Sequence, residues 1–274
     1  MNTNTHPRGT ITGYSHSKCY ARADQNCSKK ISKEHFISKT LLMQIQLNNT
    51  AKIAGLSWQQ NETFNIIPVS GLASRILCER HNNALSTLDA CMGSFAQSIA
   101  DYDAALNSSA TSDASEIRTY SGDDLERWMV KALLGLTASN NLAATNLEPE
   151  CVDLLFANTA WPEGWGLYFA LSSKQIHHSA SFLIETKVDP ARALILAANF
   201  TIRGVPFVLC LGKSDNPQSF GQFRPEAIVF RNGACEKVLE LKWLHGAQSQ
   251  AILLNHAGRY DGPPPDWNEW ERNG

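Results

Sequence analysis

The chain has 274 residues, of which 43% are hydrophobic and 18% are charged, with 17 Gly and 11 Pro. This composition is globular, so it excludes a disordered chain, a collagen-like or coiled-coil rod and a small disulfide scaffold. No apolar run reaches the roughly 18 residues of a membrane helix, so we expect no membrane partner. The first twenty residues are polar and lack a secretory signal. Because the chain also has an odd number of Cys, seven, we expect the protein to lie in the reducing cytoplasm.

The net charge of −2 is unevenly distributed along the chain. Residues 1–100 carry ten Lys and Arg against five Asp and Glu, whereas residues 101–274 carry fourteen against 21. A basic segment next to an acidic one indicates that the first part meets a polyanion such as a nucleic acid. The alternative is an ordinary basic surface that has no ligand.

Two helices are predicted on either side of a polar stretch. Residues 82–103 form an amphipathic helix because their large apolar side chains recur at spacings of three and four. These side chains are Leu85, Leu88, Met92, Phe95 and Ile99. Residues 101–124 are rich in Ser, Asp and Ala, which indicates a linker or exposed loop. Ser121 then supplies an N-cap for a second helix over 123–138.

From about Cys151 onward the pattern is typical of β-strands. Five short runs are rich in aromatic and β-branched residues, and several are separated by turn residues: 164–171, 179–186, 193–202, 205–212 and 226–233. They predict a mainly antiparallel sheet that carries the helix at 123–138. We therefore expect an α+β protein with one domain over 10–110 and a mixed α+β domain, of no indicated role, over 118–274.

Soft metal ligands occur in two pairs that a long insert separates. Seven residues lie between Cys19 and Cys27, and two lie between Cys78 and His81. Each pair comes from a tight turn, and tetrahedral zinc takes four sulfur or nitrogen ligands, so the spacing indicates a structural Zn²⁺ site. The alternative is a chance alignment, since the first pair is spaced more widely than a usual zinc knuckle.

Two stretches around these ligands resemble the HNH nuclease family. Residues 29–42 read KKISKEHFISKTLL, with an acidic residue and a histidine before an apolar pair, and residues 77–89 read LCERHNNALSTLD. The resemblance covers residues 17–103, about a third of the chain. It implies that this part is a ββα-metal finger held together by a zinc treble clef.

The resemblance also implies a role for each matching residue. His35 would be the general base, because a neutral imidazole can take a proton from water near pH 7. Glu34 and Asn82 would hold one catalytic Mg²⁺ or Mn²⁺, which leaves most of its coordination sphere to water and phosphate oxygens. The expected activity is hydrolysis of phosphodiester bonds in nucleic acid, with DNA as the expected substrate. Such nucleases often serve bacterial restriction or phage defence.

One position of the family pattern has no clear match. The central Asn that orients the base histidine is absent just before Cys78, and Asn65, Ser74 or a backbone carbonyl could take its role. Four basic residues near the motif are expected to contact nucleic-acid phosphates, with a solvated surface as the alternative. They are Lys33, Lys39, Arg75 and Arg80.

A second function class stays open beside the nuclease. It is a catalytically inactive, zinc-stabilised nucleic-acid-binding module, which the missing central Asn and the modest basic charge favour. A hydrolase formed by the C-terminal part has no motif behind it. If the protein cuts both strands with one active site per chain, a homodimer is expected.

The remaining candidates are expected to be structural. His177 and His178 are adjacent in a loop before a strand, and we expect no metal shared between them. Trp161 and Trp165 are expected to pack rather than to stack on bases. The cysteines outside the motif are expected to be small buried hydrophobes: Cys91, Cys151, Cys210 and Cys235.

Overall fold

The computed structural model describes residues 4–46, 48–54, 56–59, 65–108, 115–142, 145–156, 159–169, 175–178, 182–213, 217–244 and 248–259. In these ranges the α-helices are α1 (Lys39–Ile45), α2 (Glu79–Asn107), α3 (Gly122–Ala138) and α4 (Glu150–Leu155). Short 3₁₀ helices are η1 (Arg22–Asp24), η2 (Val69–Gly71) and η3 (Pro217–Phe220). None of the helices described is both long and apolar enough to span a lipid bilayer.

The strands form two larger and two small sheets. The small sheets pair β1 (Ile31–His35) with β4 (Ala73–Cys78), and β2 (Thr50–Ile53) with β3 (Asn65–Pro68). One larger sheet is antiparallel throughout, in the order β11 (Gln222–Phe223), β6 (Gly166–Phe169), β10 (Val205–Cys210), β9 (Leu194–Ile202) and β8 (Phe182–Asp189). The other has the order β5 (Glu116–Ser121), β13 (Cys235–Lys242), β12 (Pro225–Asn232), β14 (Gln248–Arg259) and β7 (Gln175–His178). The sheets are mostly antiparallel, so the predicted α+β class is confirmed.

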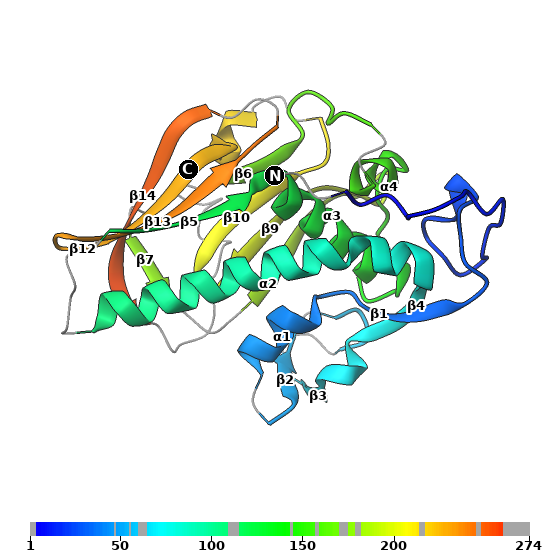
Figure 1. Cartoon of the computed structure of the whole chain (residues 1–274), viewed down its shortest axis with the longest axis horizontal. Helices are drawn as coiled ribbons and strands as arrows, with labels where there is room; N and C mark the ends of the chain where they lie inside the picture. Colours follow the sequence, from blue (N-terminus) through cyan, green and yellow to red (C-terminus); the bar gives the residue numbers. More distant parts are fainter. Residues whose placement is uncertain are drawn as a thin grey trace.

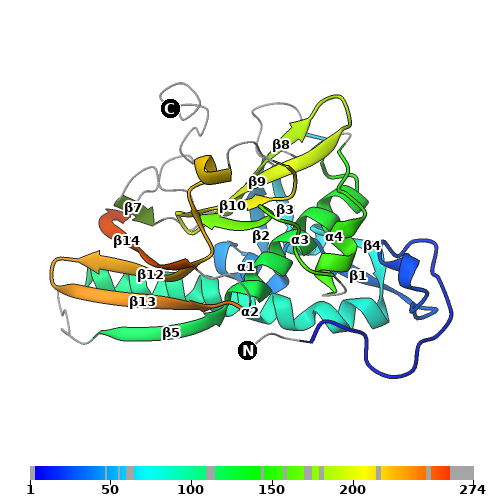
Figure 2. The same ribbon diagram turned by 90° about the horizontal axis from the view of Figure 1, so that it is seen from above.

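The long helix α2 lies between the N-terminal elements and the larger sheets. Figure 1 shows α1, β2 and β3 on one side of α2 and the larger sheets on the other. The helix contacts β5, β12, β13 and β14, which lie alongside it in Figure 2. The predicted apolar stripe of α2 is fully buried, from Leu85 to Ile99, because the helix has these elements to cover on one face and α1 on another.

The five predicted strands are present as β6, β8, β9, β10 and β12. Sequence patterns did not predict β13, although buried positions alternate along it with half-buried ones and, at Lys242, an exposed one. His177 and His178 were predicted to lie in a loop, whereas they end β7. Their side chains lie outside the described part, so the expectation about a shared metal is not addressed.

The interpretation of residues 101–124 as a linker is wrong for most of the segment. Its first part continues α2, because Tyr102 and Leu106 extend the buried stripe of that helix. Its later part forms β5, which pairs in parallel with β13 more than a hundred residues downstream. A strand whose partner is so distant carries no local turn signal, and its polar composition resembles that of a loop.

Helix α3 is buried along most of its length. Ser121 caps it as predicted, accepting a hydrogen bond from the backbone N–H of Asp124. Every residue from Gly122 to Leu136 is buried, including charged ones, because α2, α4 and β13 surround the helix. One continuous apolar cluster runs from Cys19 to Leu254, so the two parts expected as domains share this core.

Candidate metal centre and active site

The site is built on the strand pair β1–β4 and on α2, which begins directly after β4. Ile31 lies opposite Cys78, and His35 lies opposite Ala73. Because a strand rises ~3.3 Å per residue, His35 and Cys78 lie at opposite ends of the pair, roughly 13 Å apart along it. The cysteine end and the Glu34–His35 end are therefore two separate centres.

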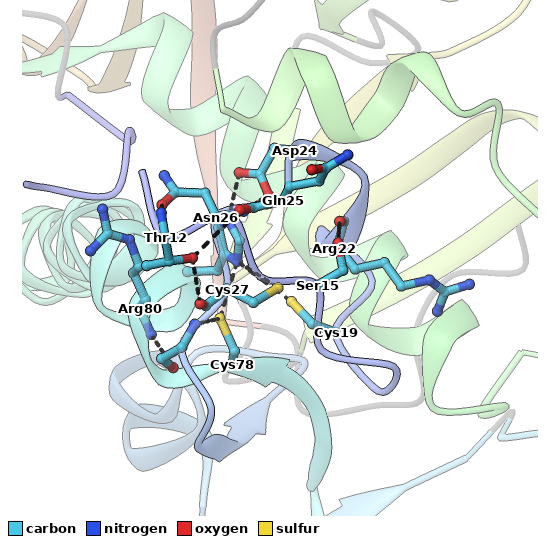
Figure 3. Close-up of polar contacts among 12 residues, drawn as sticks. Thr12, Ser15, Cys19, Arg22, Asp24, Gln25, Asn26, Cys27, Cys78 and Arg80 are labelled. Atoms are coloured by element: carbon cyan, nitrogen blue, oxygen red, sulfur yellow. Dashed lines mark hydrogen bonds and ion pairs between the residues drawn. The ribbon is translucent and has the colours of Figure 1, made fainter. Parts of the chain in front are cut away.

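At the cysteine end, the four predicted ligands converge. The side chains of Cys19, Cys27, Cys78 and His81 are buried, and their ligand atoms all lie within 4.8 Å of one another. Nδ1 of His81 is 3.1 Å from Sγ of Cys78, 3.5 Å from that of Cys19 and 3.8 Å from that of Cys27. Figure 3 shows the three thiols turned toward one another. Since ligands of tetrahedral zinc with bonds of ~2.0–2.3 Å lie roughly 3.5 Å apart, this Cys₃His cluster could bind a structural metal ion such as zinc.

The thiols of this cluster shift one another's pKa. The hydrogen bond between Cys19 and Cys78 raises the pKa of Cys19 and lowers that of Cys78 to about 2, and burial raises the pKa of Cys27. The thiolate is the form that binds a metal, so a bound dication would stabilise the charged form of the two thiols whose pKa is raised. The donor set therefore fits Zn²⁺.

A carboxylate that the sequence did not single out completes the cluster. Oδ2 of Asp24, at the end of η1, lies 2.8 Å from Nε2 of His81. Burial alone would lower the pKa of His81, but hydrogen bonds to Cys78 and Asp24 raise it. A carboxylate on the far nitrogen fixes the tautomer and ring orientation of a zinc-binding histidine, so Nδ1 of His81 is left to face the thiols.

At the other end of the strand pair, Glu34 and His35 are adjacent in β1, whose pairing with β4 is irregular between Ser32 and Glu34. Glu34 is buried against α3 and forms an ion pair with Lys131. The ammonium Nζ of Lys131 also lies 2.9 Å from each carboxylate oxygen of Asp89 on α2. Burial raises the pKa of Glu34, although Lys131 acts in the opposite direction.

His35 is half-buried, and its surroundings favour the neutral imidazole. Burial, together with the positive charges of Lys39, Lys131 and Lys33, lowers its pKa. Its Nε2 is buried and has no hydrogen-bond partner among the described residues. A neutral, unengaged imidazole nitrogen is suited to accept a proton.

Asn82 lies in the first turn of α2, at the cysteine end, and is half-buried. Asp89 follows it by seven residues, which is ~10.5 Å along a helix axis. The structure therefore places Asn82 about two helical turns from Asp89, which shares an ammonium partner with Glu34.

Neither of the two side chains considered for the central position of the HNH pattern lies opposite His35 in the strand pair. Ser74 lies opposite Glu34 in the strand pair, and Ala73 lies opposite His35. Asn65 belongs to β3, in a different sheet.

The four basic residues differ in their surroundings. Lys33 and Lys39 are exposed and lie within electrostatic range of His35. Arg75 is exposed on β4. The guanidinium of Arg80 donates to the backbone oxygens of Gly9 and Thr10, which anchors the N-terminal segment to α2.

The tryptophans and cysteines that were expected to be structural lie in the core or against it. Trp161 and Trp165 are partly buried against the core. Three of the other cysteines are buried and Cys91 is half-buried; all four are free thiols: Cys91, Cys151, Cys210 and Cys235.

Sequence reasoning missed Asp24, Asp89 and Lys131. Asp89 ends the LCERHNNALSTLD stretch, and Lys131 interrupts the apolar stripe of α3 three residues after Trp128. A lysine within a buried stripe needs an acidic partner, which was the available signal.

No protein-family model, no curated protein and no solved structure matches this chain. The chemistry of the two centres therefore follows from their own residues.

Proposed function

We propose that the protein is a metal-dependent endonuclease of the HNH type that hydrolyses phosphodiester bonds in nucleic acid, with DNA as its substrate. One observation carries this proposal. Two antiparallel strands followed by a helix carry a Cys₃His cluster at one end and a Glu-His step at the other. That is the order of parts that the HNH resemblance implies.

Each part has a chemical task in this proposal. Cys19, Cys27, Cys78 and His81 hold Zn²⁺, which ties η1 and its flanking loops to the start of α2. His35 takes a proton from water, and the hydroxide attacks phosphorus while the 3′ oxygen leaves. A bound Mg²⁺ or Mn²⁺, for which the resemblance implies Glu34 and Asn82 as ligands, supplies charge stabilisation on the phosphorane and the leaving oxygen. Lys33, Lys39 and Arg75 neutralise neighbouring phosphates.

The setting of this activity follows from the same resemblance. A bacterial enzyme of this kind serves restriction or phage defence. One active site per chain cuts one strand, so a homodimer supplies the two sites that a double-strand cut needs.

The decisive experiment is plasmid cleavage with Mg²⁺ or Mn²⁺, with an EDTA control. His35→Ala is expected to reduce the cleavage rate about 10²–10⁴-fold, because it removes the general base. The zinc content and thermal midpoint of His35→Ala should equal those of wild type. His6→Ala, which changes an exposed histidine, is the control and should cleave at the wild-type rate. Full cleavage by pure His35→Ala protein would end this proposal.

The second candidate is a catalytically inactive, zinc-stabilised nucleic-acid-binding module. Ala73 favours it, because no side chain at that position can orient His35. This candidate predicts that the wild-type protein shifts DNA in a gel and cleaves it with neither Mg²⁺ nor Mn²⁺.

A further inference from the structure

The segment that carries Cys19 and Cys27 forms one end of the molecule. Residues 8–30, here called the zinc loop, contain η1 and end just before β1. In Figures 1 and 2 this segment, in blue, lies beyond β4 at one end of the ribbon. It lies at the cysteine end of the strand pair, which the chemistry proposed for His35 leaves unused.

Hydrogen bonds hold the zinc loop in a defined shape. Arg80 anchors its first residues to α2 through two backbone oxygens. The hydroxyl of Thr12 donates to the backbone oxygen of Cys27, and the backbone N–H of Cys27 donates to that of Tyr14, both over 2.8 Å. Because Cys27 is one of the four converging metal ligands, the backbone at Tyr14 is fixed through the metal centre.

Two large apolar side chains project from this ordered segment. The side chain of Ile11 is 70% exposed and that of Tyr14 is 40% exposed. The ring of Tyr14 also meets that of His16 edge-on, with the ring centroids 6.3 Å apart. An exposed aromatic ring on a fixed backbone is a platform on which an unpaired base stacks at little conformational cost.

The exposed charges of the zinc loop are almost all positive. It carries five basic residues against one carboxylate. All five are exposed: Arg8, Lys18, Arg22, Lys29 and Lys30. In the part of the chain that the structure describes, Lys30 alone among them has an acidic partner, Glu79.

The one carboxylate of the zinc loop is turned to its own segment and to the metal centre. Asp24 accepts from the backbone N–H of Asn26 through Oδ1 and from Nε2 of His81 through Oδ2. Zn²⁺ bound by three thiolates adds a charge of −1, which leaves the loop and its metal centre with +3. This unbalanced positive charge faces solvent and fits a polyanion.

We propose that the zinc loop is a second nucleic-acid contact, in which Tyr14 stacks on an unpaired base while the basic side chains neutralise phosphates of the same strand. This inference rests on the proposed function for the class of partner. The occupant is a single-stranded segment, because stacking needs a base face that a duplex covers. Arg80 is then a positioning residue that holds the loop in place.

The first test is the anisotropy of a labelled single-stranded oligonucleotide mixed with the zinc-loaded full chain, without Mg²⁺ or Mn²⁺. Tyr14→Ala is expected to weaken binding about 5–150-fold, the loss of one base–aromatic stack, and Tyr14→Phe to restore it. Trp58→Ala, which removes another exposed aromatic ring, is the matched control and should stay within about twofold of wild type. Wild-type protein that does not bind, or Tyr14→Ala that binds as wild type does, overturns the proposal.

The salt dependence of the same binding tests the charges without touching Tyr14. Each phosphate contact with a single strand contributes about 0.7 to the slope of log affinity against log salt. Lys18→Gln/Arg22→Gln should therefore lower the slope by about 1.4. Lys187→Gln/Lys242→Gln removes two exposed lysines of the larger sheets and should leave it unchanged. Equal slopes for the two double variants overturn the phosphate contacts.

Plasmid cleavage assayed with the same variants separates this inference from the proposed function. Oligonucleotide binding that depends on Tyr14, in wild-type protein that cleaves nothing, keeps the zinc-loop contact and ends the nuclease proposal. Cleavage by a protein whose oligonucleotide affinity is the same with and without Tyr14 keeps the nuclease and ends the zinc-loop contact.

Discussion

Asp24 is not one of the four ligands, yet its carboxylate sets the orientation of the His81 ring. Its carboxylate accepts from Nε2 of His81, so Nδ1 is directed toward Cys78, Cys19 and Cys27. The pair also links η1 to the start of α2 across 57 residues of sequence. One carboxylate thus orients the ring of His81 and also holds η1 against the start of α2.

Asp24→Asn is expected to weaken zinc binding about 10–100-fold, because the amide no longer fixes the imidazole as a carboxylate does. Competition with a chromophoric zinc chelator measures this change. Glu79→Gln is the matched control, since the ion pair of Glu79 with Lys30 lies in the same region but is solvent-exposed. Equal zinc affinities of the two variants would contradict the role given to Asp24.

For single residues, the spacing of Cys and His in the sequence was sufficient to predict the four side chains that converge. It could not identify Asp24, because the partner of a metal-binding histidine can come from any element that passes nearby. Nor could it find Lys131, since whether the space beside Glu34 holds water, a metal ion or an ammonium depends on how α3 packs. The Glu-His step was visible in the sequence, whereas its surroundings depend on residues about a hundred positions away.

Among the elements, the close packing of α3 against the segment that follows β1 depends on one glycine. A Cβ atom at Gly135 would lie 2.7 Å from Cβ of Phe36 and 3.0 Å from its Cα. Phe36 directly follows His35, so the approach of α3 controls the position of the proposed base. A methyl group here has backbone as its neighbour and cannot be accommodated by a side-chain rotation alone.

Gly135→Ala is expected to lower the free energy of unfolding by up to about 2 kcal/mol, since overpacking costs about 1–3 kcal/mol and helix propensity returns about 1. Urea unfolding measures this change. Gly71→Ala is the control, because nothing lies within 4 Å of a Cβ atom at that position. A Gly135→Ala variant as stable as the Gly71→Ala variant would contradict the close packing.

The elements found from sequence were those with strong local patterns. The stripe of α2, the cap of α3 and five aromatic-rich strands all carry their signal within about ten residues. β5 carries none, because Glu116, Arg118 and Thr119 are polar and the strand is defined by parallel pairing with β13. Parallel pairs need long crossover connections, so the sequence between partners says little about them.

In the molecule as a whole, a buried ion pair joins α3 to the strands that follow it. Nε and Nη2 of Arg224 lie 2.7 and 2.9 Å from the two carboxylate oxygens of Glu126, which also accepts from the backbone N–H of Leu167. The guanidinium packs over the rings of Trp161, Phe223 and Trp243. Burial raises the pKa of Glu126 to about 7 in spite of this partner.

Arg224→Met is expected to cost about 3–5 kcal/mol at neutral pH, because it leaves a buried carboxylate unpaired. A carboxyl whose pKa is higher in the folded than in the unfolded state contributes stability below its usual value of 4.5, and this stability is lost as the pH rises through the folded value. The variant should therefore lose stability from about pH 4.5 upward, and over a wider pH range than wild type, because removal of Arg224 raises the folded pKa of Glu126 further.

Thermal midpoints measured between these pH values test the sign of this dependence. Arg231→Met, on β12, is the control, since its pair with Glu236 is partly exposed and contributes about 0–1 kcal/mol. A pH profile of Arg224→Met that rises or stays flat would show that Glu126 remains ionised without its partner.

Both centres depend on side chains that lie beyond residue 118. Phe156, at the end of α4, packs edge-on against the ring of His81, and Lys131 neutralises Glu34. A fragment cut after α2 would strip the imidazole of its aromatic cover and leave the glutamate without its counter-charge. Both centres therefore have to be assayed in a chain that includes α3 and α4.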